Sequence, residues 1–375
     1  MNDETKLIFS TCVSGVITHG ILVVTIDNPP VNAASAAMRA GLLAAAQQAG
    51  SDASITALVI TGAGRIFVGG ADIGEFGKPP ADPSLPTVLE AIEQSAKPVV
   101  AAINGAALGG GLEIAIACHY RIASPTASFA FPEVKLGIVP GAGGTQRLPR
   151  LTGQAVALDM IGTGRSAKAA EALQAGIIDA IAADPVAEAL GKVTSGEQVS
   201  FRKTGELAVP TESGDKIEAA AAKIRARAKG QTAPLEAVRL VLASADVAFR
   251  DGLADERKTF VQLRDSAEAA ALRYYFFAER EAAKVDGLKD VVPRPISRIG
   301  IVGTGLMGSG IVVAAVDAGY HVIGVEQTAD AAQKGFDRIK ALLERNLKSG
   351  RIDETGFSER LARLTISNCL RIQIW

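Results

Sequence analysis

The sequence predicts an α/β protein with two domains, and two observations carry this prediction. Four short apolar runs, each typical of a buried strand, occur in the first third of the chain with helical stretches between them. These runs are Ile21–Ile26, Ala57–Thr61, Val99–Ile103 and Ser128–Phe131. Near the other end, a strand, a glycine-rich turn, a helix and a second strand follow in order between Arg298 and Glu326. A length of 375 residues is sufficient for two domains.

The composition excludes several classes of protein. Hydrophobic residues make up 48% of the chain and the net charge is −1, which favours a compact protein over a disordered or nucleic-acid-binding one. No apolar run approaches the roughly 20 residues that a membrane span needs. Cys12, Cys118 and Cys369 are few and widely separated, which predicts a reducing compartment. The three histidines lack metal-ligand spacing, so no metal site is expected.

Two glycine-rich stretches in the first domain each precede a carboxylate. They are Gly69-Gly70-Ala71-Asp72-Ile73 and Gly109-Gly110-Gly111-Leu112-Glu113. Glycines let a backbone N–H approach a ligand closely, so each stretch can supply one hydrogen-bond donor. Such a pair of donors beside acid/base groups is the equipment of an oxyanion hole.

Glu113 belongs to a segment that is otherwise apolar on all sides, which predicts a buried helix. A carboxylate near the start of a buried helix is costly unless it is paired or protonated, and this makes Glu113 a catalytic candidate. The alternative is that the glycines only form a tight turn and Glu113 only caps the first helical turn.

Glu133 follows Pro132 at the end of a weakly alternating strand. A Pro-Glu step in that place is often a solvated turn, and this alternative stays open for Glu133 alone. The combination of two carboxylates in apolar settings with two candidate N–H donors favours a catalytic site. Further glycines follow in Pro140-Gly141-Ala142-Gly143-Gly144, ahead of Thr145-Gln146-Arg147-Leu148.

The segment from about Leu22 to Gly176 resembles the enoyl-CoA hydratase/isomerase superfamily, the crotonases. The matching motifs, in chain order, are Asp27-Asn28-Pro29-Pro30-Val31-Asn32-Ala33, Thr61-Gly62 with Phe67, Gly70-Ala71-Asp72-Ile73, Lys97-Pro98-Val99-Val100-Ala101, Asn104-Gly105, Leu108-Gly109-Gly110-Gly111, Pro132-Glu133, Pro140-Gly141 and Arg147-Leu148. The resemblance implies a crotonase spiral of ββα units.

The resemblance also implies the roles of individual residues. The backbone N–H groups of Ala71 and Gly110 would form the oxyanion hole for a thioester, Glu113 would activate water, and Glu133 would exchange the proton at C2. Hydratases have glutamate at both positions, so hydration of 2-trans-enoyl-CoA is implied, with 3-enoyl to 2-enoyl isomerisation as a companion activity and no cofactor. Further substrate contacts would be Gly70, Asp72, Ile73, Gly109, Pro140 and Gly141. Lys78 and Arg65 could meet the CoA phosphates, but a solvated surface role is favoured for each.

The glycine-rich turn near the end of the chain has the G-x-G-x-x-G spacing of a dinucleotide-binding motif in Gly303, Gly305 and Gly308. Glu326 ends the second strand, 326 − 303 = 23 residues after the first glycine, where an acid would bind the ribose hydroxyls of NAD. The alternative is a glycine-rich turn in some other α/β unit.

Together, the two parts resemble the multifunctional fatty acid β-oxidation enzymes, in which a hydratase precedes a 3-hydroxyacyl-CoA dehydrogenase. We expect a crotonase core at 1–185, a helical extension at 186–285, a linker at 286–297 and an incomplete Rossmann unit at 298–375. Helices are expected at 217–229, 234–243 and 265–284 from their Ala, Leu, Glu and Arg content. Only the first two Rossmann strands are expected, and therefore no dehydrogenase activity and poor NAD binding.

The resemblance implies acyl-CoA thioesters as ligands and leaves a monomer and a trimer as alternatives. It implies the cytoplasm as the location in a bacterium and the peroxisome in a eukaryote. A catalytically silent fragment that only binds acyl-CoA remains the alternative to an active hydratase.

Overall fold

The computed structural model describes residues 6–79, 81–195, 202–282, 284–285, 287–288 and 291–368. It contains two compact units, Met1–Ala283 and Lys284–Trp375, which are described separately. Cys369, the residues after it and part of the predicted linker lie outside the described residues. The limits predicted for the crotonase core and its helical extension stay predictions.

A seven-stranded sheet forms the centre of the first unit, in the order β1-β2-β3-β4-β6-β8-β11. The pairs β1–β2 and β2–β3 are antiparallel, and the pairs from β3 to β11 are parallel. Its strands are β1 (Lys6–Ser10), β2 (Val13–Thr18), β3 (Ile21–Ile26), β4 (Ala57–Gly62), β6 (Val99–Ile103), β8 (Tyr120–Ala123) and β11 (Ala180–Ile181). The central strands β4 and β6 are buried at every residue, which explains their continuous apolar sequences.

A four-stranded sheet in the order β10-β9-β7-β5 carries the turns that lead into the catalytic candidates. Its strands are β5 (Ile66–Val68), β7 (Ala106–Leu108), β9 (Ser128–Ala130) and β10 (Ser166–Lys168). The first three pair in parallel, so their carboxyl ends lie at one edge. The Ala71 loop follows β5, Gly109 follows β7, and Glu133 follows β9.

Helices cover both faces of the large sheet. On one face, α1 (Ala36–Ser51), α2 (Leu85–Glu93) and α3 (Gly110–Ala117) contribute to the main hydrophobic core. On the other face, Val186, Ala189 and Val193 of α7 (Pro185–Thr194) pack against strand residues. Short 3₁₀ turns occur at Ile73–Glu75, Pro132–Leu136 and Thr204–Glu206.

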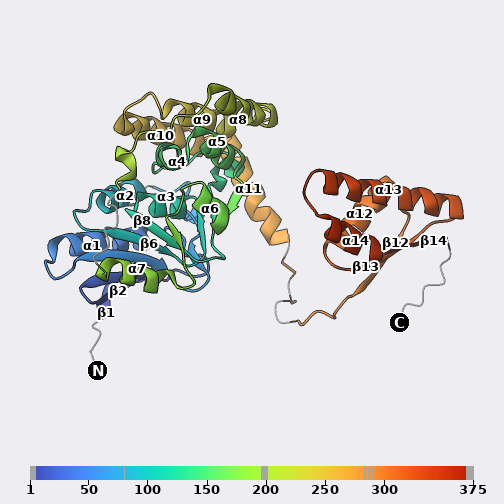
Figure 1. Cartoon of the computed structure of the whole chain (residues 1–375), viewed down its shortest axis with the longest axis horizontal. Helices are drawn as coiled ribbons and strands as arrows, with labels where there is room; N and C mark the ends of the chain where they lie inside the picture. Colours follow the sequence, from blue (N-terminus) through green and yellow to red (C-terminus); the bar gives the residue numbers. More distant parts are fainter. Residues whose placement is uncertain are drawn as a thin grey trace. The chain divides into compact units, whose positions relative to one another are not determined.

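A helical layer lies over the α2–α3 side of the first unit (Figure 1). It contains α4 (Gly144–Thr152), α5 (Gln154–Thr163), α8 (Gly214–Arg227), α9 (Thr232–Ala243) and α10 (Phe249–Arg264), while α6 (Ala169–Gln174) and α11 (Ala267–Ala282) complete the unit. The three helices predicted in the extension occur as α8, α9 and α11. The sequence analysis did not predict α10.

The second unit has a three-stranded parallel sheet in the order β12-β13-β14. Its elements are β12 (Arg298–Val302), α12 (Leu306–Asp317), β13 (His321–Val325), α13 (Ala329–Lys348), α14 (Glu354–Ala362) and β14 (Leu364–Ser367). The expectation of only two strands was wrong. The long amphipathic helix α13 returns the chain to the sheet, where β14 pairs with β13 and Leu364 joins the core of the unit.

Candidate active site

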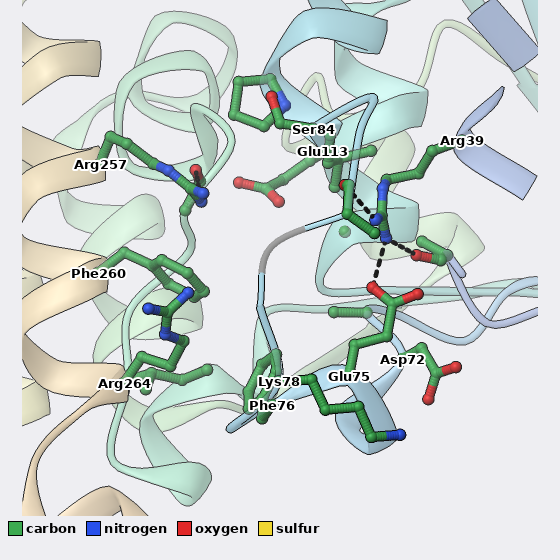
Figure 2. Close-up of a pocket in the computed structure, with 18 of the residues that line it drawn as sticks. Arg39, Asp72, Glu75, Phe76, Lys78, Ser84, Glu113, Arg257, Phe260 and Arg264 are labelled. Atoms are coloured by element: carbon green, nitrogen blue, oxygen red, sulfur yellow. Dashed lines mark hydrogen bonds and ion pairs between the residues drawn. The ribbon is translucent and has the colours of Figure 1, made fainter. Parts of the chain in front are cut away.

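A pocket in the first unit brings the predicted catalytic residues together (Figure 2). Ala71 and Gly110 line it, as do both glutamates, Glu113 and Glu133. The Ala71 loop and the following segment form one wall, and α10 forms the opposite wall with Arg257, Phe260 and Arg264 (Figure 2).

The backbone N–H groups predicted as an oxyanion hole lie next to each other. A β-carbon placed on Gly110 would lie 3.7 Å from the nitrogen of Ala71 and 3.9 Å from Oε2 of Glu113. Gly110 is the first residue of α3, so its N–H has no acceptor within the helix. The bond that ties the loop to Ala34 uses the carbonyl of Gly70 (2.8 Å), not the N–H of Ala71. Both donors are therefore available at one end of the pocket.

Glu113 is held by the glycine-rich loop that precedes α4. Its Oε1 accepts hydrogen bonds from the N–H groups of Ala142 (2.7 Å) and Gly144 (3.0 Å). Burial raises the pKa of Glu113, and the two N–H donors act in the opposite direction by favouring the ionised form. Since Oε1 faces the loop, Oε2 remains on the Gly110 side of the pocket.

Glu133 has a different environment. The residue is half-buried, but its Oε2 is enclosed and has no hydrogen-bond partner among the described residues. Burial raises the pKa of Glu133 well above its ordinary value, and the charges of Glu113 and Glu256 raise it further. Glu133 is therefore the carboxyl group more readily protonated at neutral pH.

The sequence analysis missed a third buried carboxylate, Glu256 on α10. Its Oε1 accepts from the N–H of Gly143 (2.5 Å), and its Oε2 accepts from the N–H (2.8 Å) and the hydroxyl (2.6 Å) of Thr145. Only 1% of Glu256 is exposed. Burial, followed by the charge of Glu113, raises its pKa to about 8. The spacing of Phe249, Leu253, Glu256, Phe260 and Leu263 along one helical face is the signal that would have indicated α10.

A buried ion pair supports the same glycine-rich loop. Arg147 forms a bidentate pair with Glu93 of α2, at 3.1 and 2.8 Å, and both side chains are almost fully buried. The Nη1 of Arg147 also donates to the carbonyl of Ala142 (2.8 Å). The loop that holds Glu113 is thus fixed through its carbonyl as well as its N–H groups.

The other predicted substrate contacts divide into two groups. Asp72 and Gly141 line the pocket, and Asp72 also caps the turn at Ile73–Glu75 by accepting from the N–H of Gly74 (2.9 Å). The residues that line the pocket do not include Gly70, Ile73, Gly109 or Pro140. Gly109 lies behind it, where a β-carbon would stand 2.6 Å from Oε1 of Glu133.

Of the two cationic residues considered as contacts for the CoA phosphates, Lys78 lines the pocket and Arg65 does not. The structure adds Arg257 and Arg264 of α10, which the sequence analysis missed. Arg39 also lines the pocket, but it pairs with Glu75 (2.8 Å) and donates to three backbone carbonyls, and so it fixes the wall.

The predicted nucleotide motif in the second unit has open space around its first two glycines. A β-carbon on Gly303 or Gly305 would meet no atom within 4 Å, whereas one on Gly308 would collide with the carbonyl of Gly303. Oε1 of Glu326 accepts from the N–H of Thr304 and from its hydroxyl, the latter at 2.9 Å. These hydrogen bonds lower the pKa of Glu326 and fix the turn in front of α12.

The two-sheet α/β fold with this glycine-lined pocket is of the crotonase type, and two parts of the chain match known families. Residues 16–195 match the enoyl-CoA hydratase/isomerase family. Residues 298–372 match the NAD binding domain of 3-hydroxyacyl-CoA dehydrogenase.

The chain is 42% identical over 344 residues to a peroxisomal bifunctional enzyme of Danio rerio, covering 88% of this chain and 48% of the relative. It is 38% identical over 371 residues to a glyoxysomal fatty acid beta-oxidation multifunctional protein of Cucumis sativus, covering 92% of this chain and 50% of the relative. The chain spans about half the length of the curated relatives it matches.

Solved structures match the first unit. An enoyl-CoA hydratase from Mycobacterium avium subsp. paratuberculosis aligns with a TM-score of 0.54 at 25% identity, covering 72% of this chain and 97% of that one. A carnitinyl-CoA hydratase from Mycobacterium avium aligns with a TM-score of 0.50 at 28% identity, covering 72% and 96%. Within the described residues, no helix is long and apolar enough to span a membrane, and no cluster of potential metal ligands occurs.

Proposed function

We propose that the first unit hydrates 2-trans-enoyl-CoA to 3-hydroxyacyl-CoA. The observation that carries the proposal is one pocket lined by two glutamates in unequal environments and by two adjacent backbone donors. The family of residues 16–195 supports the same reaction class.

The unequal environments suggest which glutamate acts as base and which as acid. Glu113 accepts two N–H bonds, which favour its carboxylate form, so it would take the proton of a water molecule whose oxygen attacks C3. The neutral form is favoured more strongly in Glu133 than in Glu113, so Glu133 would deliver its proton to C2. The hydroxyl of the water then ends on C3 and the proton of Glu133 on C2. Glu113 releases the water proton to the solvent and Glu133 regains a proton from it, so that one water is added and both groups are restored.

Negative charge develops on the thioester oxygen between these two events. The N–H groups of Ala71 and Gly110 would bind that oxygen as an enolate, and each such donor typically contributes roughly 3 to 4 kcal/mol to the lowering of the barrier. The same two carboxyl groups can move a proton between C2 and C4, so isomerisation of 3-enoyl-CoA is proposed as a companion activity.

The second unit has residues that fit NAD. The open space at Gly303 and Gly305, directly before the N-terminus of α12, suits a pyrophosphate, and Glu326 lies at the end of the neighbouring strand. Bound NAD supplies a hydride acceptor. We propose that Glu326 receives the ribose hydroxyls while it keeps the Thr304 turn in place.

The peroxisomal and glyoxysomal names of the relatives agree with the peroxisomal alternative for location, which remains a proposal for this chain.

Loss of the conjugated enoyl-thioester absorbance with crotonoyl-CoA tests the proposed hydration. Glu113→Gln and Glu133→Gln should each lower kcat by about 10²- to 10⁴-fold. Glu188→Gln on α7, at the other face of the large sheet, is the matched control and should keep the full rate. No activity in the unaltered chain, despite binding of the thioester, would contradict the proposal and favour the silent acyl-CoA binder.

A further inference from the structure

We propose that Glu256 is a positioning residue for the hydration reaction, acting through the loop that holds Glu113. The inference rests on the proposed function of the first unit. Glu256 lies on α10 at residues 249–264, beyond the residues 16–195 that match the hydratase/isomerase family.

Two carboxylates share consecutive donors of one loop. The N–H groups of Ala142 and Gly144 point to Glu113, and the intervening N–H of Gly143, together with that of Thr145, points to Glu256. Alternate donors therefore serve opposite sides of the loop. A displacement of the loop toward either carboxylate would lengthen the bonds to the other.

Helix α10 packs closely against the segment that contains this loop. A β-carbon on Gly141 would stand 2.5 Å from the ring of Phe260, and one on Gly252 would collide with Gln146. Gln146 donates to the hydroxyl of Thr145 (3.1 Å), which leaves the hydroxyl proton for Glu256. Helix and loop thus form one hydrogen-bonded unit.

Glu256 also acts on one of the two proposed catalytic groups when it is ionised. The charge of Glu113 on α3 raises the pKa of Glu256, and the charge of Glu256 raises the pKa of Glu133 after β9. Arg147 on α4 and Arg257 on α10 are the positive charges nearby, and Glu93 of α2 is paired with Arg147. Removal of the Glu256 charge should therefore lower the pKa of Glu133.

Glu256→Gln tests the proposal because the amide keeps the size of the side chain but offers one acceptor oxygen instead of two. We expect kcat for crotonoyl-CoA to fall by about 10- to 100-fold with little change in KM, since misplacement of a catalytic group by about 1 Å costs up to roughly 10²-fold. The high-pH limb of the pH–rate profile, which ionisation of Glu133 sets, should move to lower pH. Thr145→Val, which removes one donor to Glu256, should lower kcat less.

Asp255→Asn is the matched control: it changes the neighbouring carboxylate of α10, which pairs with Arg239 at the surface, and should leave kcat and the pH profile unchanged. Amide hydrogen exchange adds a readout that does not need turnover. The peptide containing residues 142–147 should exchange faster in Glu256→Gln than in Asp255→Asn.

The outcomes separate the two proposals. An inactive unaltered chain would overturn the hydration reaction and the inference that rests on it. An active chain in which Glu256→Gln keeps its kcat and pH profile would overturn only the positioning role. Unchanged exchange of the 142–147 peptide would also overturn that role, because the loop would then be held without Glu256.

Discussion

The glycines at the pocket of the first unit and the first two glycines of the motif in the second unit lie in opposite surroundings. In the first unit, glycines around the pocket are in close contact: β-carbons on Gly109, Gly110 and Gly141 would each stand less than 3 Å from another side chain. In the second unit, β-carbons on Gly303 and Gly305 would meet no atom within 4 Å. The first set is needed so that the protein can pack catalytic groups against its own backbone. The second set leaves room for a molecule from outside.

Among the variants that test this difference between the glycines, Gly109→Ala should have the largest effect, a loss of activity. Gly109 has φ +50°, and the added methyl group would stand 2.6 Å from Oε1 of Glu133. Displacement of this carboxyl group should lower kcat by about 10²-fold. Steady-state hydration of crotonoyl-CoA measures it, and a variant with full activity would show that Glu133 need not occupy the observed position.

The buried ion pair beneath the loop should have the next largest effect. Glu93→Gln leaves the buried guanidinium of Arg147 without its charge partner, and breaking such a pair costs about 3 kcal/mol or more of unfolding free energy. Asp330→Asn is the control in the second unit, where the pair with Lys334 is mostly exposed and should contribute less than about 0.5 kcal/mol. Denaturant unfolding measures the loss of unfolding free energy in both variants. Equal losses would contradict the expectation that the buried pair contributes more than the exposed pair.

Two glycines of the motif in the second unit have different surroundings: Gly308 packs against the backbone, whereas Gly305 borders open space. Gly308→Ala should destabilise this unit by about 1–3 kcal/mol, because the methyl group would collide with the carbonyl of Gly303. Gly305→Ala should leave stability almost unchanged but weaken NAD binding, since it fills space reserved for the ligand. Thermal unfolding and NAD titration distinguish the two variants. Loss of stability in Gly305→Ala would contradict the open space found around Gly305.

The sequence predicts those parts of the site whose residues lie close together along the chain. The apolar run after Gly111 predicts a buried helix, and α3 places Glu113 in its first turn. The glycine spacing and the acid after the second strand likewise predict the turn at Gly303 and the position of Glu326. In both places, helix periodicity and glycine geometry act within one short segment.

The missed features depend on contacts between distant segments. Glu256 lies 113 residues from Gly143, and no local pattern reveals which loop a helix on the surface of the core will hold. Strand β14 was missed for a similar reason: its pairing with β13 depends on two intervening helices, α13 and α14. Arg257 and Arg264 enter the pocket only because α10 forms its wall.

The central claim is that the two glutamates have different tasks. Exchange of the C2 proton of butanoyl-CoA with deuterium from the solvent tests this claim most directly. This saturated thioester has no double bond to hydrate, so only the group that reaches C2 is needed. Glu133→Gln should abolish the exchange and Glu113→Gln should retain it. In the unaltered chain the rate should rise with pH as Glu133, whose pKa is raised, becomes ionised. Exchange that survives in Glu133→Gln and is lost in Glu113→Gln would contradict the assignment.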